Sequence, residues 1–133
     1  MASIDIVNTN NSTDLLSFAT TTIPNSYASS TSLYCTSGDQ TFYVTIVKNA
    51  TIGTVTFRCQ ASGDDSSFSD VQSTRQDTGA VANEHVFNVA AGGTYRFIVT
   101  CTTARRAKSM RVSLKADVQG GAGESVLVTG TAW

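Results

Sequence analysis

Histidine and cysteine are the side chains that most often hold a metal or carry out catalysis, and this sequence contains few of either. His85 is its one histidine, and Cys35, Cys59 and Cys101 are its three cysteines. A serine triad or a metal site built on His85 requires an oriented partner, yet the sequence has no G-x-S-x-G motif and no metal-ligand spacing. We therefore predict no catalytic residue, no metal ligand and no cofactor, and interpret His85 as a core or surface side chain.

The cysteines do not have the spacing of a zinc site, because there is no C-x-x-C pair and only one histidine. An odd number of cysteines without a secretory signal is also atypical of a disulfide framework. We interpret all three as small buried hydrophobic side chains. Two alternatives stay open: Cys59 and Cys101 pair across neighbouring strands, or one cysteine links subunits after assembly.

Carboxylates gather in the segment GDDSSFSD, residues 63–70, where they could share a calcium ion. The segment lacks the alternating Asp/Asn pattern of a calcium loop, and Gly, Asp and Ser all favour tight turns. We therefore favour a turn over a calcium site. No pair of carboxylates shows the arrangement that sugar hydrolysis needs, with one acid in an apolar pocket.

Charge is distributed unevenly along the chain. Residues 1–47 contain three Asp and neither Lys nor Arg, whereas residues 96–116 contain six Lys or Arg and no acid. Arg105, Arg106 and Lys108 crowd one predicted hairpin tip. They are either the solvated charges of a turn or a positive patch that docks on an acidic partner surface, such as the N-terminal half of another copy.

Two observations argue against nucleic-acid binding. The net charge is −1 and the sequence pI is about 5.6, whereas generic nucleic-acid binders are basic. Tyr95 and Phe97 lie on the predicted core face and do not alternate with the basic residues. We predict that nucleic acid is not a partner.

The C-terminal segment has a different character from the rest. After Gly123 the chain is almost uncharged, and it ends in Trp133, the one tryptophan. A terminal tryptophan is either frayed or part of a strand that pairs with another subunit by β-augmentation. Trp133 therefore joins Arg105, Arg106 and Lys108 as a candidate interaction residue.

The elements that position these residues are predicted to be strands. Ser and Thr make up 36 of the 133 residues, and charged residues only 14%. Abundant Thr and Val with scarce Lys, Glu and Gln argue against a helical bundle. Apolar residues instead alternate with polar ones. Strands are expected at residues 2–7, 14–20, 32–36, 40–48, 54–61, 68–73, 84–89, 94–101, 109–117 and 124–133.

The predicted fold is an antiparallel β-sandwich or jelly roll of eight to ten short strands. Residues 40–48 carry apolar side chains on both faces, which predicts a central strand covered on each side. Residues 1–119 form the sandwich, and residues 120–133 form a Gly-rich break with a C-terminal strand or tail of the same domain. The expected core comprises Phe42, Phe57, Phe87, Phe97, Val112 and Leu114.

Two stretches carry a resemblance to known proteins. They are GTVTFRCQASGDDSSFSDV, residues 53–71, and GTYRFIV, residues 93–99, continuing into SMRVSL, residues 109–114. Together they resemble small β-sandwich structural proteins of tailed bacteriophages, such as head decoration (cement) proteins and other minor virion proteins. They are also similar to discoidin-like sugar-binding sandwiches. The resemblance covers about half of the chain and assigns no functional residue.

This resemblance implies a non-enzymatic virion protein that binds by surface complementarity. We expect a capsid decoration protein whose partners are other virion proteins, the major capsid protein above all, and which forms a homo-oligomer, with a trimer favoured. The sequence shows no secretory signal and no apolar run of about 20 residues that could span a membrane. We therefore expect synthesis in the host cytoplasm, assembly into the virion and no membrane partner. The alternatives are a tail or baseplate component and a carbohydrate-binding module that uses Tyr27, Tyr34 or Trp133.

Overall fold

Every regular element that the structure describes is a β-strand. The computed structural model describes residues 12–18, 23–30, 32–34, 40–101 and 108–131. Nine of the twelve strands in these ranges are longer than two residues, which agrees with the predicted eight to ten. In chain order the strands are β1 (Ser12–Phe18), β2 (Ala28–Ser29), β3 (Leu33–Tyr34), β4 (Gln40–Lys48), β5 (Thr54–Ser62), β6 (Ser69–Val71), β7 (Ser73–Arg75), β8 (Val81–Ala82), β9 (Glu84–Asn88), β10 (Gly93–Cys101), β11 (Ser109–Ala116) and β12 (Ser125–Thr131).

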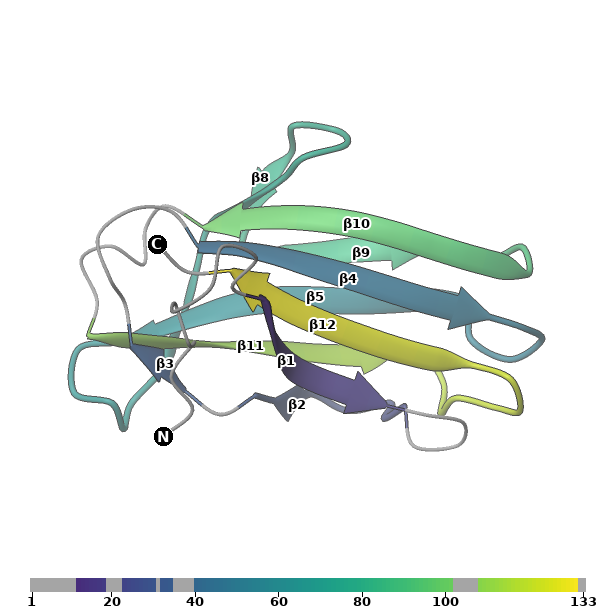
Figure 1. Ribbon diagram of the computed structural model, residues 1–133, viewed down its shortest axis with the longest axis horizontal. Helices are drawn as coiled ribbons and strands as arrows, with labels where there is room; N and C mark the ends of the chain where they lie inside the picture. Colours follow the sequence, from purple (N-terminus) through teal and green to yellow (C-terminus); the bar gives the residue numbers. More distant parts are fainter. Residues whose placement is uncertain (1–11, 19–22, 31, 35–39, 102–107, 132–133) are drawn as a thin grey trace.

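The strands form two sheets that stack face to face (Figure 1). The first sheet has the order β1-β12-β4-β10-β7-β8. The second has the order β2-β11-β5-β6, with β3 also on β11 and β9 also on β5. Every pairing between the described strands is antiparallel. The predicted all-β sandwich is therefore confirmed.

Three phenylalanine rings cross the interior and hold the two sheets together. Phe42 on β4 lies 6.1 Å from Phe57 on β5, and Phe57 lies 6.3 Å from Phe87 on β9, measured between ring centroids. All three side chains are fully buried, as are the predicted core residues Val112 and Leu114. Tilted ring pairs of this kind add to the free energy gained by burying apolar area.

Phe97 departs from the predicted core because one side of the sandwich is open. Its ring stacks on Phe87 at a centroid distance of 4.1 Å, but the side chain is only half-buried. Strand β10 has β7 beside it only at Val99 and Thr100. No described strand therefore covers the edge of β10 next to Phe97.

The prediction that residues 40–48 are covered on both faces is wrong in one respect. Strand β4 is central, lying between β12 and β10, and its inward residues from Gln40 to Lys48 are buried. Its outward side chains are not covered, and Tyr43 is 40% exposed. An antiparallel sheet in a two-layer sandwich packs with one face and leaves the other to solvent.

The C-terminal strand lies inside the first sheet. Strand β12 runs between β1 and β4 and pairs with β4 from Ser125 to Thr131. A Cβ at Gly120, in the segment before it, would come within 2.7 Å of the Ile23 side chain. Glycine is needed there because the two backbones approach closely. The predicted strand at 2–7 lies outside the described residues.

Glu124 ties the turn after β4 to the turn before β12. Its fully buried carboxylate accepts hydrogen bonds from the backbone N–H groups of Asn49, Thr51, Ile52 and Gly121, at 2.8–3.3 Å. Burial would raise the pKa of Glu124, but these backbone donors lower it from 4.5 to about 2. The side chain therefore stays charged in the folded protein.

The aromatic core gives a first prediction. Phe57→Ala removes the ring that contacts both Phe42 and Phe87, and it should lower the free energy of unfolding by about 3–5 kcal/mol. Urea denaturation followed by far-ultraviolet circular dichroism measures the change in unfolding free energy. Val86→Ala, at a valine that is 54% exposed, is the matched control and should cost no more than about 0.5 kcal/mol. Equal losses in the two variants would contradict the described core.

A second prediction concerns Glu124. Glu124→Gln places an amide NH2 among backbone donors and should cost about 2 kcal/mol of stability at neutral pH. Because the folded-state pKa lies below the ordinary value, the stabilisation is complete above pH 4.5 and is lost as the pH falls toward 2. The stability difference between the two proteins should therefore shrink over that range. Denaturation midpoints measured at several pH values test this, and a difference independent of pH would contradict it.

Candidate interaction surface

The outer faces of the two sheets differ in composition. We use the name Thr-rich face for the outward side chains of β10, β4 and β12. Residues that pair across neighbouring strands share a face, so the register assigns them directly. Arg96 carries the one charge among these eleven described residues, which are Thr94, Arg96, Ile98, Thr100, Thr41, Tyr43, Thr45, Val47, Ser125, Leu127 and Thr129.

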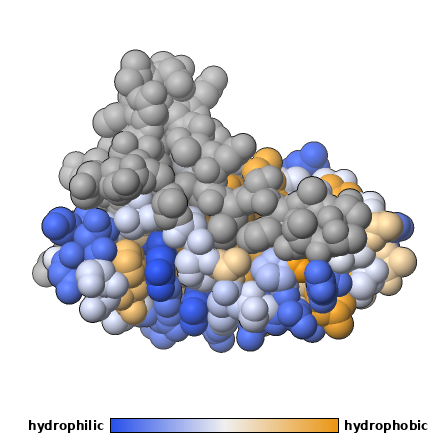
Figure 2. Space-filling view, turned by 90° about the horizontal axis from the view of Figure 1, so that it is seen from below, coloured by the Kyte–Doolittle hydropathy of each residue, from blue (hydrophilic) through white to orange (hydrophobic). Residues whose placement is uncertain are grey.

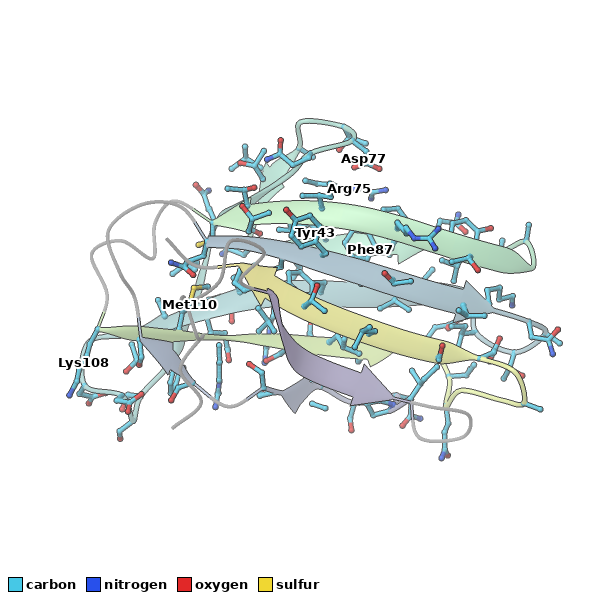
Figure 3. The ribbon with its side chains drawn as sticks, in the orientation of Figure 1. Tyr43, Arg75, Asp77, Phe87, Lys108 and Met110 are labelled. Carbon is cyan, nitrogen blue, oxygen red and sulfur yellow. The ribbon has the colours of Figure 1, made fainter. Side chains whose placement is uncertain are left out.

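Tyr43 and Ile98 form the apolar centre of the Thr-rich face. The two residues are directly opposite each other in the β4–β10 register, and each is 40% exposed. Figure 3 shows Tyr43 on the outer side of β4, away from Phe87 between the sheets. Thr129 extends the same row on β12, and Leu127 lies in the adjacent row opposite Thr45. The result is a nearly neutral surface on three adjacent strands, of which β12 and β4 are paired on both sides along most of their length.

The outer face of the second sheet, which we call the charged face, carries ionic side chains around Tyr27. The Arg58 guanidinium lies 3.7 Å and the Lys115 ammonium 4.7 Å from the centre of the Tyr27 ring. The Tyr27 hydroxyl donates a hydrogen bond to Glu84. Burial and this hydrogen bond both raise the pKa of Tyr27. Tyr27 is thus held by cation–π and hydrogen-bond contacts within the chain.

The remaining ionic groups of the charged face also find partners on that face. Arg58 forms an ion pair with Asp70 at 3.6 Å, and Gln60 donates a hydrogen bond to Asp70 at 2.9 Å. Arg111 donates a hydrogen bond to the side-chain amide oxygen (Oε1) of Gln60 at 2.8 Å, and its guanidinium lies 4.3 Å from the Phe68 ring centre. These contacts satisfy much of the hydrogen-bonding capacity of the face internally.

The fold separates the basic residues that lie close together in the sequence. Arg96 is on the Thr-rich face, whereas Arg111 and Lys115 are on the charged face. Lys108 is exposed at one end of the sandwich, remote from Arg75 and Asp77 (Figure 3). The other three predicted interaction residues, Arg105, Arg106 and Trp133, lie outside the described residues.

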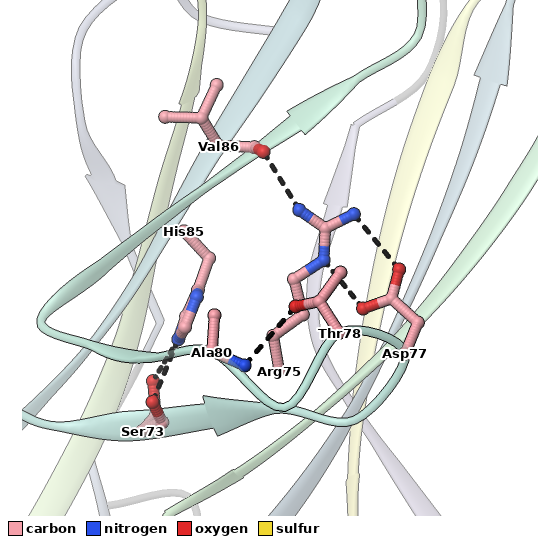
Figure 4. A network of polar contacts seen from close by, with 7 residues as sticks. All are labelled: Ser73, Arg75, Asp77, Thr78, Ala80, His85 and Val86. Atoms are coloured by element: carbon pink, nitrogen blue, oxygen red, sulfur yellow. Dashed lines mark hydrogen bonds and ion pairs between the residues drawn. The ribbon is translucent and has the colours of Figure 1, made fainter.

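His85 is a buried structural residue on β9. Its Nε2 atom lies 3.0 Å from both the carbonyl oxygen and the hydroxyl of Ser73 (Figure 4). Burial lowers the pKa of His85, which keeps the ring neutral at pH 7. Its position agrees with the interpretation as a core side chain.

Arg75 closes part of the open side next to His85. Its guanidinium donates to both Asp77 carboxylate oxygens, at 2.7 and 3.0 Å, and to the Val86 carbonyl oxygen at 3.1 Å (Figure 4). It also lies about 5 Å from the centres of the Phe87 and Phe97 rings. The Arg75 side chain therefore links the turn after β7 to the edge of β9.

The acidic segment at residues 63–70 uses its carboxylates for separate tasks. Asp64 accepts hydrogen bonds from the Ser66 and Ser67 N–H groups and from the Ser62 hydroxyl, and these lower its pKa to about 2. Asp65 accepts a hydrogen bond from the Ser109 hydroxyl at 2.7 Å. Asp70 faces Arg58 instead. The observed contacts are those of the predicted turn.

Within the described ranges, no three His, Cys, Asp or Glu side chains gather where they could hold a metal ion. Among the same residues, no helix is long and apolar enough to cross a membrane. In the view of Figure 2, hydrophobic residues occur as small separate patches among hydrophilic and near-neutral ones.

Comparison with known proteins identifies a shared fold. No model of a known protein family matches the sequence, and no curated protein matches it. The structure is similar to the crystal structure of the SPBc2 prophage-derived protein YomS, with a TM-score of 0.54 at 13% sequence identity. The match covers 95% of this chain and 96% of that chain. The sandwich therefore occurs, over nearly its whole length, in a prophage-derived protein.

The exposure of the Thr-rich face gives a third prediction. Tyr43→Ser and Ile98→Ser each remove only a solvent-facing cross-strand contact, so each should cost about 1 kcal/mol or less in unfolding free energy. Urea denaturation of the two variants and of wild type tests this. A loss as large as that expected for Phe57→Ala would mean that these side chains serve the fold and not a surface.

Proposed function

We propose that this chain is a non-enzymatic virion structural protein, specifically a head decoration (cement) protein that binds and stabilises a phage capsid lattice. The observation that carries the proposal is the Thr-rich face: a sheet surface with one charge, centred on exposed Tyr43 and Ile98. Its partners are the major capsid protein and further copies of this chain, with a trimer as the expected oligomer. Its location is the virion.

The physical character of the Thr-rich face suits binding to a rigid partner. Thr, Val and Ile are β-branched and stiff at χ1, and the strands beneath them pair with one another along their length, so little side-chain or backbone freedom is lost on binding. With one charge on the face, few ionic groups need to be stripped of water. The charged face is a weaker candidate because its ionic groups already contact one another.

Two further arguments support a virion role. The sandwich fold is similar over nearly its whole length to a prophage-derived protein, and the sequence resembles small structural proteins of tailed phages. Each copy bound at a junction of capsid subunits adds binding free energy to the assembled lattice and none to separated subunits. Mass action then shifts the equilibrium toward the intact shell.

A sugar-binding role has less support from the described residues. Sugar recognition by a sandwich surface uses an aromatic ring face that is open to the ligand. The Tyr27 ring is contacted by Arg58 and Lys115, and its hydroxyl is bonded to Glu84. A tail or baseplate role uses the same kind of surface, so the location of the protein in the particle separates it from the head role.

The location is measured on phage particles purified from a lysate of cells that carry the gene. Mass spectrometry of the particles should detect the chain at a copy number comparable to that of the major capsid protein, and immunogold electron microscopy should label the heads. Labelling confined to tails would replace the head assignment with the tail alternative. Absence of the chain from purified particles would overturn the virion proposal.

Binding through the Thr-rich face gives the fourth prediction. The double variant Tyr43→Glu/Ile98→Glu introduces two charges at its centre, and it should reduce binding to capsids that lack the protein by at least about 100-fold. Val86→Glu is the matched control, because it adds a charge at an exposed valine on the other sheet. Co-sedimentation with capsids measures both. Unchanged binding of the double variant, or an equal loss in the control, would contradict the assigned face.

A further inference from the structure

Cys59 and Cys101 meet across the interior although they belong to different sheets. Cys59 is on β5 of the second sheet and Cys101 is on β10 of the first. Both thiols are fully buried. Cys59 pairs with Val71 on β6, and the Cys101 thiol lies 3.6 Å from the carbonyl oxygen of Gln72, the next residue, so both side chains reach the same part of the interior. The sequence-based alternative placed them on neighbouring strands; the observed fold places them opposite each other between the sheets.

Polar groups line this pair on the side of β7. The Ser73 hydroxyl, one residue beyond Gln72, lies 3.0 Å from His85 Nε2. The Cys101 thiol donates to the Gln72 carbonyl oxygen at 3.6 Å. The two sulfur atoms therefore sit in a small polar cluster at the margin of an otherwise apolar core.

We propose that Cys59 and Cys101 are a covalent modification site: they form a disulfide between the two sheets when the chain meets a low-molecular-weight disulfide oxidant. Exchange proceeds in two steps. One protein thiolate attacks the oxidant and forms a mixed disulfide, releasing one small thiol; the second thiolate then displaces the other small thiol. The oxidant gains the two electrons that the two cysteines lose, and their two protons end on the released thiols.

The bond would join one strand of each sheet covalently. It would connect β5 to β10 and close the chain between residues 59 and 101 into a loop. Closing a loop of this length restricts the unfolded chain and so favours the folded state. It would also stop the two sheets from separating near the open side beside Phe97. The inference concerns the isolated chain and does not depend on the proposed capsid role.

The chemistry predicts when the bond forms. Hydrogen bonding to Cys101 and burial raise the pKa of the Cys59 thiol, so the folded protein holds it protonated and shielded. Exchange with the native protein should therefore be slow, and it should become fast once the sandwich is opened by denaturant. Oxidation during refolding is thus the efficient route.

The test uses a Cys35→Ser variant, which leaves Cys59 and Cys101 as the two thiols. The protein is unfolded in urea and refolded with oxidised glutathione or, in parallel, with dithiothreitol. The oxidised sample should lose about 2 Da in intact mass relative to the reduced one, yield a peptide linking residues 59 and 101, and melt on the order of 10 °C higher. Adding dithiothreitol should reverse all three changes.

Matched variants make the outcome decisive. Cys35→Ser/Cys59→Ser and Cys35→Ser/Cys101→Ala should take up one glutathione and show no rise in melting temperature. A parent variant that carries only glutathione adducts, keeps both thiols free, or melts no higher when cross-linked would overturn the proposal. These measurements need no capsid. Absence of the Cys59–Cys101 disulfide would therefore leave the capsid-binding proposal unaffected, and absence of capsid binding would leave the disulfide proposal unaffected.

Discussion

The alternation of side chains along paired strands is the constraint on which the rest of this molecule depends. Each strand points one residue inward and the next outward, and a slip of one residue in any pairing would exchange the two sets. The inward set meets in the ring contacts of Phe42, Phe57 and Phe87, which bridge the two sheets. A slip of one residue would place these rings in water, so the core selects against that slip in β4, β5 and β9.

Once the core has fixed the register, the outward residues are free to specialise. The first sheet presents the Thr-rich face, and the second presents ionic groups that contact one another around Tyr27 and Gln60. Both faces are held by the same interior, so each is as rigid as the fold itself. A rigid, preformed surface is what an accessory protein needs when its partner is a repeated lattice. The turn anchored by Glu124 extends this rigidity to one end of the sandwich.

Much of the fold could be predicted from the sequence because strand periodicity is a local signal. The alternation at residues 40–48 and 94–101 predicts β4 and β10 almost to the residue, and Phe87, an expected core residue in the segment at 84–89, is buried. The exposure of the outward side chains could be predicted less accurately than the strands. The apolar side chains of Tyr43 and Val47 predict a covered face, whereas Thr41 and Thr45, which alternate with them on the same face, indicate a wet one.

The relative positions of residues far apart in the sequence could not be predicted from local sequence patterns. The separation of Arg96 from Arg111 onto opposite faces follows from the two sheets being stacked, which no spacing along the chain specifies. The meeting of Cys59 with Cys101 likewise depends on β5 and β10 belonging to different sheets. The glycines at 120 and 121 were interpreted as a flexible break, yet Gly120 is placed where the chain passes against Ile23. A local composition signal cannot distinguish flexibility from close approach.

A cryo-electron-microscopy reconstruction of the mature particle tests the central claim most directly. The account predicts density for this sandwich on the capsid exterior, with the outward residues of β10, β4 and β12 against the major capsid protein and the Tyr27 side facing solvent. Density that seats the molecule through its charged face, or a shell on which no copy of this chain is present, would contradict it.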